Sequence, residues 1–101
     1  MLQQVTHENF AEEVLQAQGP VVVDFYADWC APCQAQTPIL EQFASQRGGV
    51  SVVKVNIDLN PELANEYSVR SIPTLKVFDA GEVKTSLTGL TDLSTLNKLD
   101  L

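Results

Sequence analysis

The sequence predicts an α/β fold with a central mixed sheet. Stretches rich in apolar and β-branched residues alternate with segments in which apolar residues recur at helical spacing. Near the end of the chain, Ala80-Gly81 separates two strand-like stretches with the spacing of a tight hairpin turn. The sheet should therefore be parallel through its early crossovers, antiparallel at the final hairpin, and covered by helices on both faces.

The first part of the chain should form a short strand, a helix and a buried strand. A strand is expected at residues 2–5, and Thr6 is placed to cap a helix that stops at Gly19-Pro20. The following run at residues 21–27, "VVVDFYA", is almost continuously apolar and β-branched. Such runs are typical of strands buried on both faces, so we expect this one at the centre of the sheet.

The middle of the chain should add a long helix, a second buried strand and a short helix. The helix after the cysteines should end near Arg47, and Pro38 inside it should produce a kink. Residues 50–58, "VSVVKVNID", are again rich in β-branched residues and predict a buried strand. The segment "NPELANEY" then predicts a helix with Asn60 as its cap and Pro61 at its first position.

The last part of the chain should form a hairpin and a closing helix. Residues 74–79 and 83–88 flank the tight turn and predict an antiparallel pair of strands. Leu93 and Leu96 recur at helical spacing, so we expect a final helix that begins after Thr91.

Length and composition indicate one globular domain, residues 1–101. With 101 residues, 45% of them hydrophobic, the chain can bury a core without needing a disulfide to fold. The formal net charge is -7 and the Lys and Arg residues form no run, so nucleic acid and anionic membranes are poor partners. The N-terminus lacks a basic start followed by an apolar stretch, and no apolar run is long enough to span a bilayer. We therefore expect a soluble cytoplasmic protein.

Both cysteines lie in "ADWCAPCQ", residues 27–34, where the buried strand ends and the long helix begins. They could form a static disulfide, half of a metal site or a redox pair. A structural zinc site needs four ligands, and the chain's one histidine, His7, is distant in sequence and expected at the surface. A persistent cytosolic disulfide would be unusual. The adjacent Trp29, the proline between the cysteines and the strand-to-helix setting favour a redox pair without a metal.

The position of the cysteines suggests how they divide a thiol-disulfide reaction. Cys30 lies at or just before the first helical turn, where unpaired N–H groups and the helix dipole stabilise a thiolate. Pro32 in the first turn costs no needed hydrogen bond and stiffens the ring between the cysteines. We expect Cys30 to attack a target disulfide and Cys33, one turn later, to resolve the mixed disulfide.

Several segments beyond the cysteines resemble the thioredoxin family in the family's order and spacing. They are "VVVDFYADWCAPC", "PIL" with Pro38, "VKVNID", "VRSIPTLKVFDAGEV" and Gly89. The resemblance covers essentially the whole chain and implies the thioredoxin fold, a central mixed sheet of about five strands flanked by about four helices. It also implies a general protein disulfide reductase that needs no cofactor, acts as a monomer and is recharged by a flavin- or ferredoxin-dependent thioredoxin reductase.

Asp24 and Lys54 are charged residues inside strand-like runs. From periodicity alone, Asp24 would be a solvent-facing edge or cap residue. The resemblance implies instead that Asp24 is the family's buried carboxyl beneath the active site, which exchanges a proton with Cys33 through water, and that Lys54 is its partner. Burial would raise the pKa of Asp24, and the Lys54 ammonium would moderate that shift.

Two different predictions can be made for the configuration, cis or trans, of the peptide bond between Ile72 and Pro73. Because X-Pro bonds are cis in only about 5% of cases in folded proteins, sequence alone predicts a trans bond. The resemblance implies the family's cis-proline loop, which lies against the cysteines, keeps metal away from the thiols and offers the Ile72 backbone to an extended substrate segment. The implied docking surface comprises Trp29, Ala31, Pro32, Ile72, Pro73, Thr74 and the Gly89-Leu90 turn. Ordinary core packing is the alternative for Trp29.

The sequence departs from the family's commonest pattern at Ala31, Gln34 and Tyr26, where glycine, lysine and tryptophan are frequent. We expect Ala31 and Gln34 to change the reduction potential or the partner preference modestly. A thioredoxin-fold binding or assembly subunit, whose cysteines need not turn over, is the alternative function. An oxidant or isomerase is disfavoured by proline, rather than histidine, before Cys33.

Overall fold

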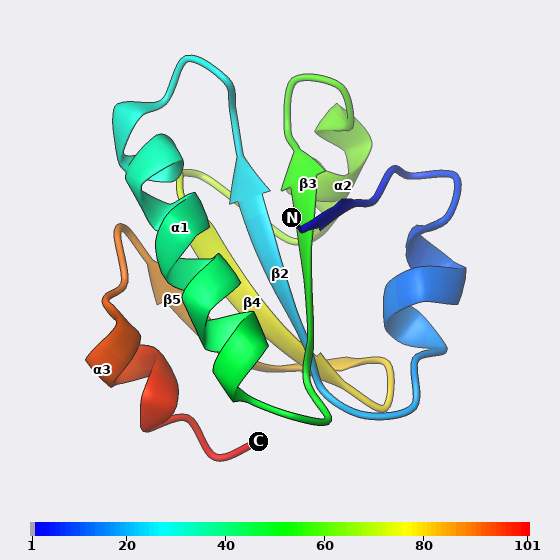
Figure 1. The fold of residues 1–101 in the computed structure, drawn as a ribbon. Coiled ribbons are helices and arrows are strands. Elements are labelled where there is room, and N and C mark those ends of the chain that lie inside the picture. The colour runs from blue at the N-terminus through cyan, green and yellow to red at the C-terminus, as the bar shows by residue number, and fades with distance from the viewer. Residues whose placement is uncertain (1) are drawn as a thin grey trace.

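The structure, a computed structural model that describes residues 2–101, contains a five-stranded sheet with strand order β1-β3-β2-β4-β5 (Figure 1). The strands are β1 (Gln3–Gln4), β2 (Val21–Tyr26), β3 (Ser51–Asn56), β4 (Thr74–Asp79) and β5 (Glu82–Thr88). The helices are η1 (Ala11–Leu15), α1 (Ala31–Gln46), α2 (Pro61–Glu66) and α3 (Leu93–Asn97). β1 and β2 are parallel to β3, whereas β4 is antiparallel to both β2 and β5. The expected mixed sheet is therefore confirmed.

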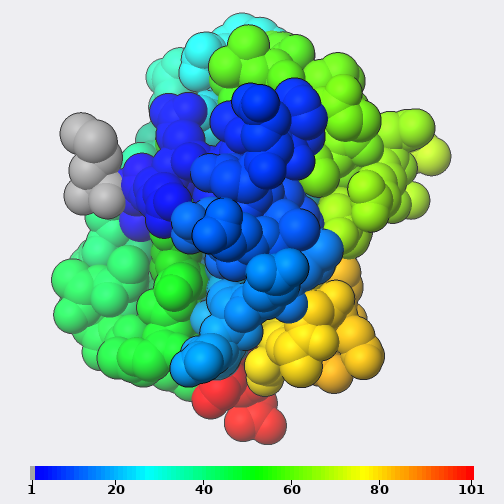
Figure 2. All heavy atoms as spheres, turned by 90° about the vertical axis from the view of Figure 1, so that its right-hand side faces the viewer, coloured from blue at the N-terminus to red at the C-terminus, as the bar shows by residue number. Residues whose placement is uncertain are grey.

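Helices cover both faces of the sheet, because successive side chains of a strand point to opposite faces. One apolar cluster joins Val23 and Phe25 of β2 to residues of η1 and α2. The other joins Val22 of β2 to Leu40 of α1 and Leu96 of α3. Figure 1 shows α1 in front of the sheet with α3 beside it, and Figure 2 shows the blue N-terminal segment next to the green region of α2. No helix within residues 2–101 is long and apolar enough to cross a membrane.

Two expected turns follow from residues that accept a positive φ. Ala80 and Gly81 have φ values of 54° and 80° and join β4 to β5 as the predicted tight hairpin. At the end of α1, Arg47 is the C-cap and Gly49 has a φ of 81°, which lets the chain turn into β3. Pro38 lies inside α1, as the sequence indicates.

The first helix is shorter than expected, and its cap is a different residue. η1 has Phe10 at its N-cap position, with no side-chain cap bond. Thr6 forms a local turn instead: its hydroxyl accepts from the N–H of Glu8, and its own N–H donates to Asn9 Oδ1 at 2.8 Å. Thr6 cannot cap the helix because these turns separate it from the helix start.

The closing helix α3 begins after Thr91, as expected, and its N-cap residue is Asp92. The Oδ1 atom of Asp92 accepts from the N–H of Thr95 at 2.8 Å. Thr91 is buried, and its backbone is held by Gln36 of α1, which donates to its carbonyl at 2.9 Å and accepts from its N–H at 2.8 Å. These two bonds between distant segments hold Thr91 outside the helix, in agreement with the expected start of the helix after Thr91.

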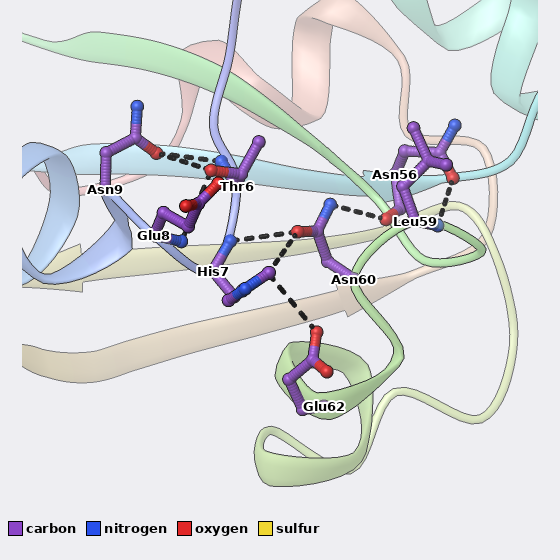
Figure 3. Close-up of polar contacts among 8 residues, drawn as sticks. All are labelled: Thr6, His7, Glu8, Asn9, Asn56, Leu59, Asn60 and Glu62. Atoms are coloured by element: carbon purple, nitrogen blue, oxygen red, sulfur yellow. Dashed lines mark hydrogen bonds and ion pairs between the residues drawn. The ribbon is translucent and has the colours of Figure 1, made fainter.

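Asn60 stands at the N-cap position of α2, with Pro61 as the first helical residue, as expected. Its side chain makes no cap bond, however, and reaches across to the N-terminal segment (Figure 3). Asn60 Oδ1 accepts from the N–H of His7 at 2.9 Å, and Nδ2 donates to the carbonyl of Asn56 at 3.0 Å. The short helix is thereby tied to β3 and to the segment that follows β1.

Candidate active site

Cys30 and Cys33 form a disulfide where β2 ends and α1 begins. Their Cα atoms are 5.2 Å apart, and the side chains are only 5% and 2% exposed. Cys30 is the N-cap residue of α1, and proline follows in the first turn, as the sequence predicts. The pair therefore lies at a helix start just below the surface.

The first turn of α1 points a backbone donor at one of the two sulfurs. The N–H of Cys33 donates to Cys30 Sγ, with an N–S distance of 3.2 Å. A hydrogen bond of this kind strengthens when the acceptor becomes charged, and the positive end of the helix dipole acts in the same direction. This geometry lowers the free energy of a Cys30 thiolate in the reduced protein.

Asp24 lies in the middle of β2 and is fully buried. Its position alternates with Val23 and Phe25, so its side chain shares a sheet face with α1. Neither carboxylate oxygen has a hydrogen-bond partner among the described residues. Burial raises the pKa of Asp24 from 3.8 to about 7, and the positive charge of Lys54 partly offsets this rise. The solvent-facing placement suggested by periodicity alone is wrong.

Lys54 of β3 is the register partner of Asp24, but its ammonium contacts other groups. Nζ donates to Thr37 Oγ1 of α1 at 2.9 Å and lies 4.1 Å from the centre of the Tyr26 ring. Lys54 and Thr37 line a cavity of about 180 Å³ whose wall includes Cys33. This cavity is large enough to hold water beside Cys33.

The loop before β4 and the turn after β5 lie together beside the cysteines. The Ile72–Pro73 bond is cis, so the trans bond predicted from base rates is wrong. Ile72 packs against the cluster that contains both cysteines, and Thr74 is buried with its hydroxyl bonded to the carbonyl of Ser71. Gly89 has a φ of 88° and donates its N–H to the carbonyl of Pro73 at 2.8 Å. This bond fixes the two loops against each other.

Trp29 projects from the surface directly before the cysteines. It is 70% exposed, so ordinary core packing is the wrong interpretation of this residue. Its indole N–H donates to Asp58 Oδ2 at 2.9 Å, which anchors the ring to the loop after β3. Ala31 and Pro32 are also exposed, and Leu90 is 52% exposed. Exposed apolar groups therefore surround the disulfide.

The buried amide side chains of Asn56 and Asn60 hold the loop that carries Asp58 in place. Asn56 Oδ1 accepts from the N–H groups of Asp58 and Leu59, at 2.9 and 3.2 Å. Asn60 connects this loop to His7, whose ring also lies 3.5 Å from Glu62 (Figure 3). His7 is at the surface, as expected.

Sequence reasoning missed Asp58, Gln36 and Thr37. A signal for Asp58 was available, because the carboxyl ends of parallel strands meet at one edge, and β2 and β3 are such neighbours. Gln36 and Thr37 carry no local signal, since their partners Thr91 and Lys54 lie 55 and 17 residues away.

Comparison with known proteins gives one consistent result. A family model described as Thioredoxin matches residues 1–99. The chain is 44% identical over 97 residues to a thioredoxin of Rickettsia felis, covering 95% of this chain and 92% of that protein. It is 44% identical over 96 residues to thioredoxin 1 of a Nostoc species, covering 94% and 90%. It is 46% identical over 99 residues to a thioredoxin of Chlamydia trachomatis, covering 98% and 95%.

These similarities agree with the geometry. The mixed five-stranded sheet with flanking helices is the thioredoxin fold, and the cysteine pair at the start of α1 is its redox centre. The substrates of such a pair are molecules that contain disulfides. The chain belongs to the thioredoxin family, whose members are thiol-disulfide oxidoreductases of the protein-disulfide reductase type.

Proposed function

We propose that the protein is a general reductase of protein disulfides in which Cys30 attacks and Cys33 resolves. The observation that carries this division of roles is the hydrogen bond from the Cys33 N–H to Cys30 Sγ at 3.2 Å. It stabilises a thiolate on Cys30 and offers nothing comparable to Cys33. Cys30 is also the slightly more exposed of the two.

The reaction has two exchange steps. The Cys30 thiolate attacks one sulfur of the target disulfide, which forms a mixed disulfide and releases the other target sulfur as a thiolate. Cys33 then loses its proton and attacks Cys30 Sγ, which expels the second target sulfur. The target gains two electrons and ends as two thiols, and the protein ends with the Cys30–Cys33 disulfide.

We propose that Asp24 accepts the Cys33 proton in the second step, through water, with Lys54 as its electrostatic partner. A carboxyl whose pKa is about 7 can both accept and return a proton near neutral pH. The cavity beside Cys33 and Lys54 supplies room for the intervening water. Asp24 is a general base in this scheme and not a nucleophile.

The exposed surface around the cysteines is proposed as the docking site for substrate. Trp29, Ala31 and Pro32 supply apolar contact area. The loop with Ile72, Pro73 and Thr74, braced by Gly89, supplies backbone groups for an extended chain segment. Proteins with accessible disulfides in extended segments are therefore the preferred substrates.

We also propose the setting in which the protein works. It acts as a monomer in the cytoplasm, and a thioredoxin reductase returns it to the dithiol form. Residues 1–101 work as one domain, because β1, near the N-terminus, and α3, near the C-terminus, belong to the same layered structure. Its net charge of -7 disfavours nucleic acid and anionic membranes as partners.

The first experiment measures reduction of insulin by dithiothreitol with the wild type, Cys30→Ser and Cys33→Ser. We expect both variants to lose turnover, because each lacks one step of the cycle. Cys33→Ser should still trap target protein as a mixed disulfide on a non-reducing gel, whereas Cys30→Ser should trap none. Trapping by Cys30→Ser would contradict the assigned roles, and an inactive but folded wild type would favour a binding subunit.

A second experiment tests Asp24. In single-turnover reduction, Asp24→Asn should slow release of the mixed disulfide by roughly 100-fold near pH 7 without abolishing it, which is the lower end of what general base catalysis contributes. The attack by Cys30 should be little changed. An unchanged release rate across pH 6 to 9 would rule out this role.

A further inference from the structure

We propose that Thr37 is a positioning residue for the reductase reaction, because its hydroxyl fixes the Lys54 ammonium beside the buried Asp24 carboxyl. This inference rests on the proposed role of Asp24. It adds a residue of α1 that reaches the reaction through Lys54.

The hydroxyl of Thr37 uses both its donor and its acceptor capacity. It accepts from Lys54 Nζ at 2.9 Å and donates to the carbonyl of Cys33 at 3.4 Å, one helical turn earlier. A hydroxyl has one hydrogen to donate, so this arrangement leaves only the acceptor role toward Lys54. The ammonium is therefore linked to the same turn of α1 that carries the resolving cysteine.

The contacts of Lys54 explain why Thr37 controls its position. The ammonium lies between Thr37 Oγ1 and the Tyr26 ring, 4.1 Å from the ring centre. It makes no hydrogen bond to Asp24, whose two oxygens have no partner among the described residues. Lys54 thus acts on Asp24 through its electrostatic field alone, and the strength of that field depends on where Thr37 and Tyr26 hold the charge.

The cavity beside Lys54 offers the ammonium group an alternative position. Lys54, Thr37, Tyr26 and Asp28 line about 180 Å³ of space. A lysine ammonium is strongly hydrated and has a flexible stem, so without the Thr37 hydroxyl it should move into this space and toward the carboxylate of Asp28. That movement takes positive charge away from Asp24, which then holds its proton more tightly.

Among the described residues, Lys54 is the charged group that shifts the pKa of Asp24. Tyr26, Asp28 and Cys33 are the other titratable groups that line the cavity beside Lys54. The β4 partner of Asp24 is Leu75, which carries no charge. A displacement of Lys54 should therefore be the main electrostatic change at Asp24 when the Thr37 hydroxyl is removed.

The test titrates the Asp24 carboxyl by carbon NMR in the oxidised protein, where the cysteines do not titrate. Thr37→Val keeps the shape of the side chain without the hydroxyl, and should raise the pKa of Asp24 by about 0.5 unit, the effect of moving one charge by a few ångströms. Thr37→Ser keeps the hydroxyl and should give the wild-type value. In the reduced protein, the pH profile of mixed-disulfide release should shift upward with Thr37→Val by the same amount.

A double-mutant cycle assigns the effect to Lys54. Lys54→Met should raise the pKa of Asp24 further than Thr37→Val does, and adding Thr37→Val to Lys54→Met should produce no additional shift. Ser45→Ala is the matched control, because Ser45 is an exposed hydroxyl of α1 that bonds to a carbonyl of its own helix. It should leave the Asp24 titration unchanged. If the Val variant folds poorly, Thr37→Ala removes the same hydroxyl with a residue that favours helix.

The inference is overturned if Asp24 titrates in Thr37→Val as it does in the wild type, if its pKa falls, or if the two substitutions shift it additively. Failure of the proposed base role has a different signature. It would appear as an unchanged pH profile of mixed-disulfide release in Asp24→Asn. That result is independent of the NMR titration, because Asp24→Asn has no carboxyl group at this position.

Discussion

Asp24 is an ionisable side chain buried in the central strand, and neither of its oxygens is hydrogen-bonded to another described residue. Taking a carboxylate out of water is costly unless partners replace the lost solvation, and Lys54 compensates only in part. The raised pKa is the measure of that cost. A residue proposed to move protons is thus also a residue that weakens the fold when it is charged.

This cost predicts how stability depends on pH. The pKa of Asp24 is about 7 in the folded protein, against an ordinary value of 3.8. Its contribution to stability is therefore fully present below about pH 4, falls as the pH rises from 4, and is lost once the pH passes 7. A pKa difference of about three between the folded and unfolded protein corresponds to roughly 4 kcal/mol in the free energy of unfolding. Asp24→Asn should therefore be more stable than the wild type by up to about 4 kcal/mol at pH 8, and the difference should largely disappear at pH 4.

Urea unfolding of the oxidised proteins at the two pH values measures this difference. Asp28→Asn is a suitable control, because Asp28 is an exposed carboxylate in the loop that follows β2. It should change the free energy of unfolding by no more than about 0.5 kcal/mol at either pH. Equal stability of Asp24→Asn and the wild type at pH 8 would contradict the account given for Asp24.

At the scale of elements, Gln36 joins the active-site helix to the loop that carries part of the docking surface. Its buried amide satisfies both the N–H and the carbonyl of Thr91, two residues after Gly89. Gln36→Leu would leave these two backbone groups unpaired in the interior, at a cost of about 2 to 4 kcal/mol in the free energy of unfolding. We also expect a higher KM for protein disulfides, because the Gly89 turn would lose its brace.

Urea unfolding and insulin reduction measure the two effects. Gln42→Leu is the matched control, since it makes the same substitution at an exposed position of α1. It should alter stability by less than about 0.5 kcal/mol and leave KM unchanged. If the two variants behave alike, the Gln36 amide does not brace the loop.

The elements also explain what could be predicted from the sequence. β2, β3 and the Ala80-Gly81 hairpin were predictable because continuous β-branched runs and tight-turn residues are local signals. The cap at Thr6 was wrong, since its hydrogen bonds with Glu8 and Asn9 form a turn ahead of the helix start. The thioredoxin fold and the cysteine pair followed from motifs in the sequence.

The rest of the candidate site depends on contacts between elements. Periodicity misplaced Asp24 because both faces of β2 are covered, so alternation along the strand no longer separates buried from exposed positions. The cis bond before Pro73 and the link between Thr37 and Lys54 also depend on neighbours from elsewhere in the chain. The resemblance to a family indicated the first of these, and only the structure revealed the second.

At the scale of the whole molecule, a formal charge of -7 is confined to a body with a radius of gyration of 12.2 Å. The Lys84–Glu82 ion pair is solvent-exposed and contributes little to stability, and the exposed His7–Glu62 contact is an ion pair only when His7 is protonated. Repulsion among the acidic groups should therefore outweigh these attractions at neutral pH. Added salt screens both, so its net effect on the folded state should be stabilising.

Thermal unfolding of the oxidised protein at pH 8 measures this balance. Raising NaCl from 10 to 150 mM shortens the screening length from about 30 Å to about 8 Å, which is below the molecular radius. We expect the Tm to rise by about 3 to 5 °C, the equivalent of somewhat less than 1 kcal/mol for a domain of this size. The same measurement at pH 4.4, near the sequence pI, is the control and should give a change below about 1 °C, because the net charge there is close to zero. A Tm at pH 8 that falls or stays constant would mean that exposed ion pairs outweigh the repulsion.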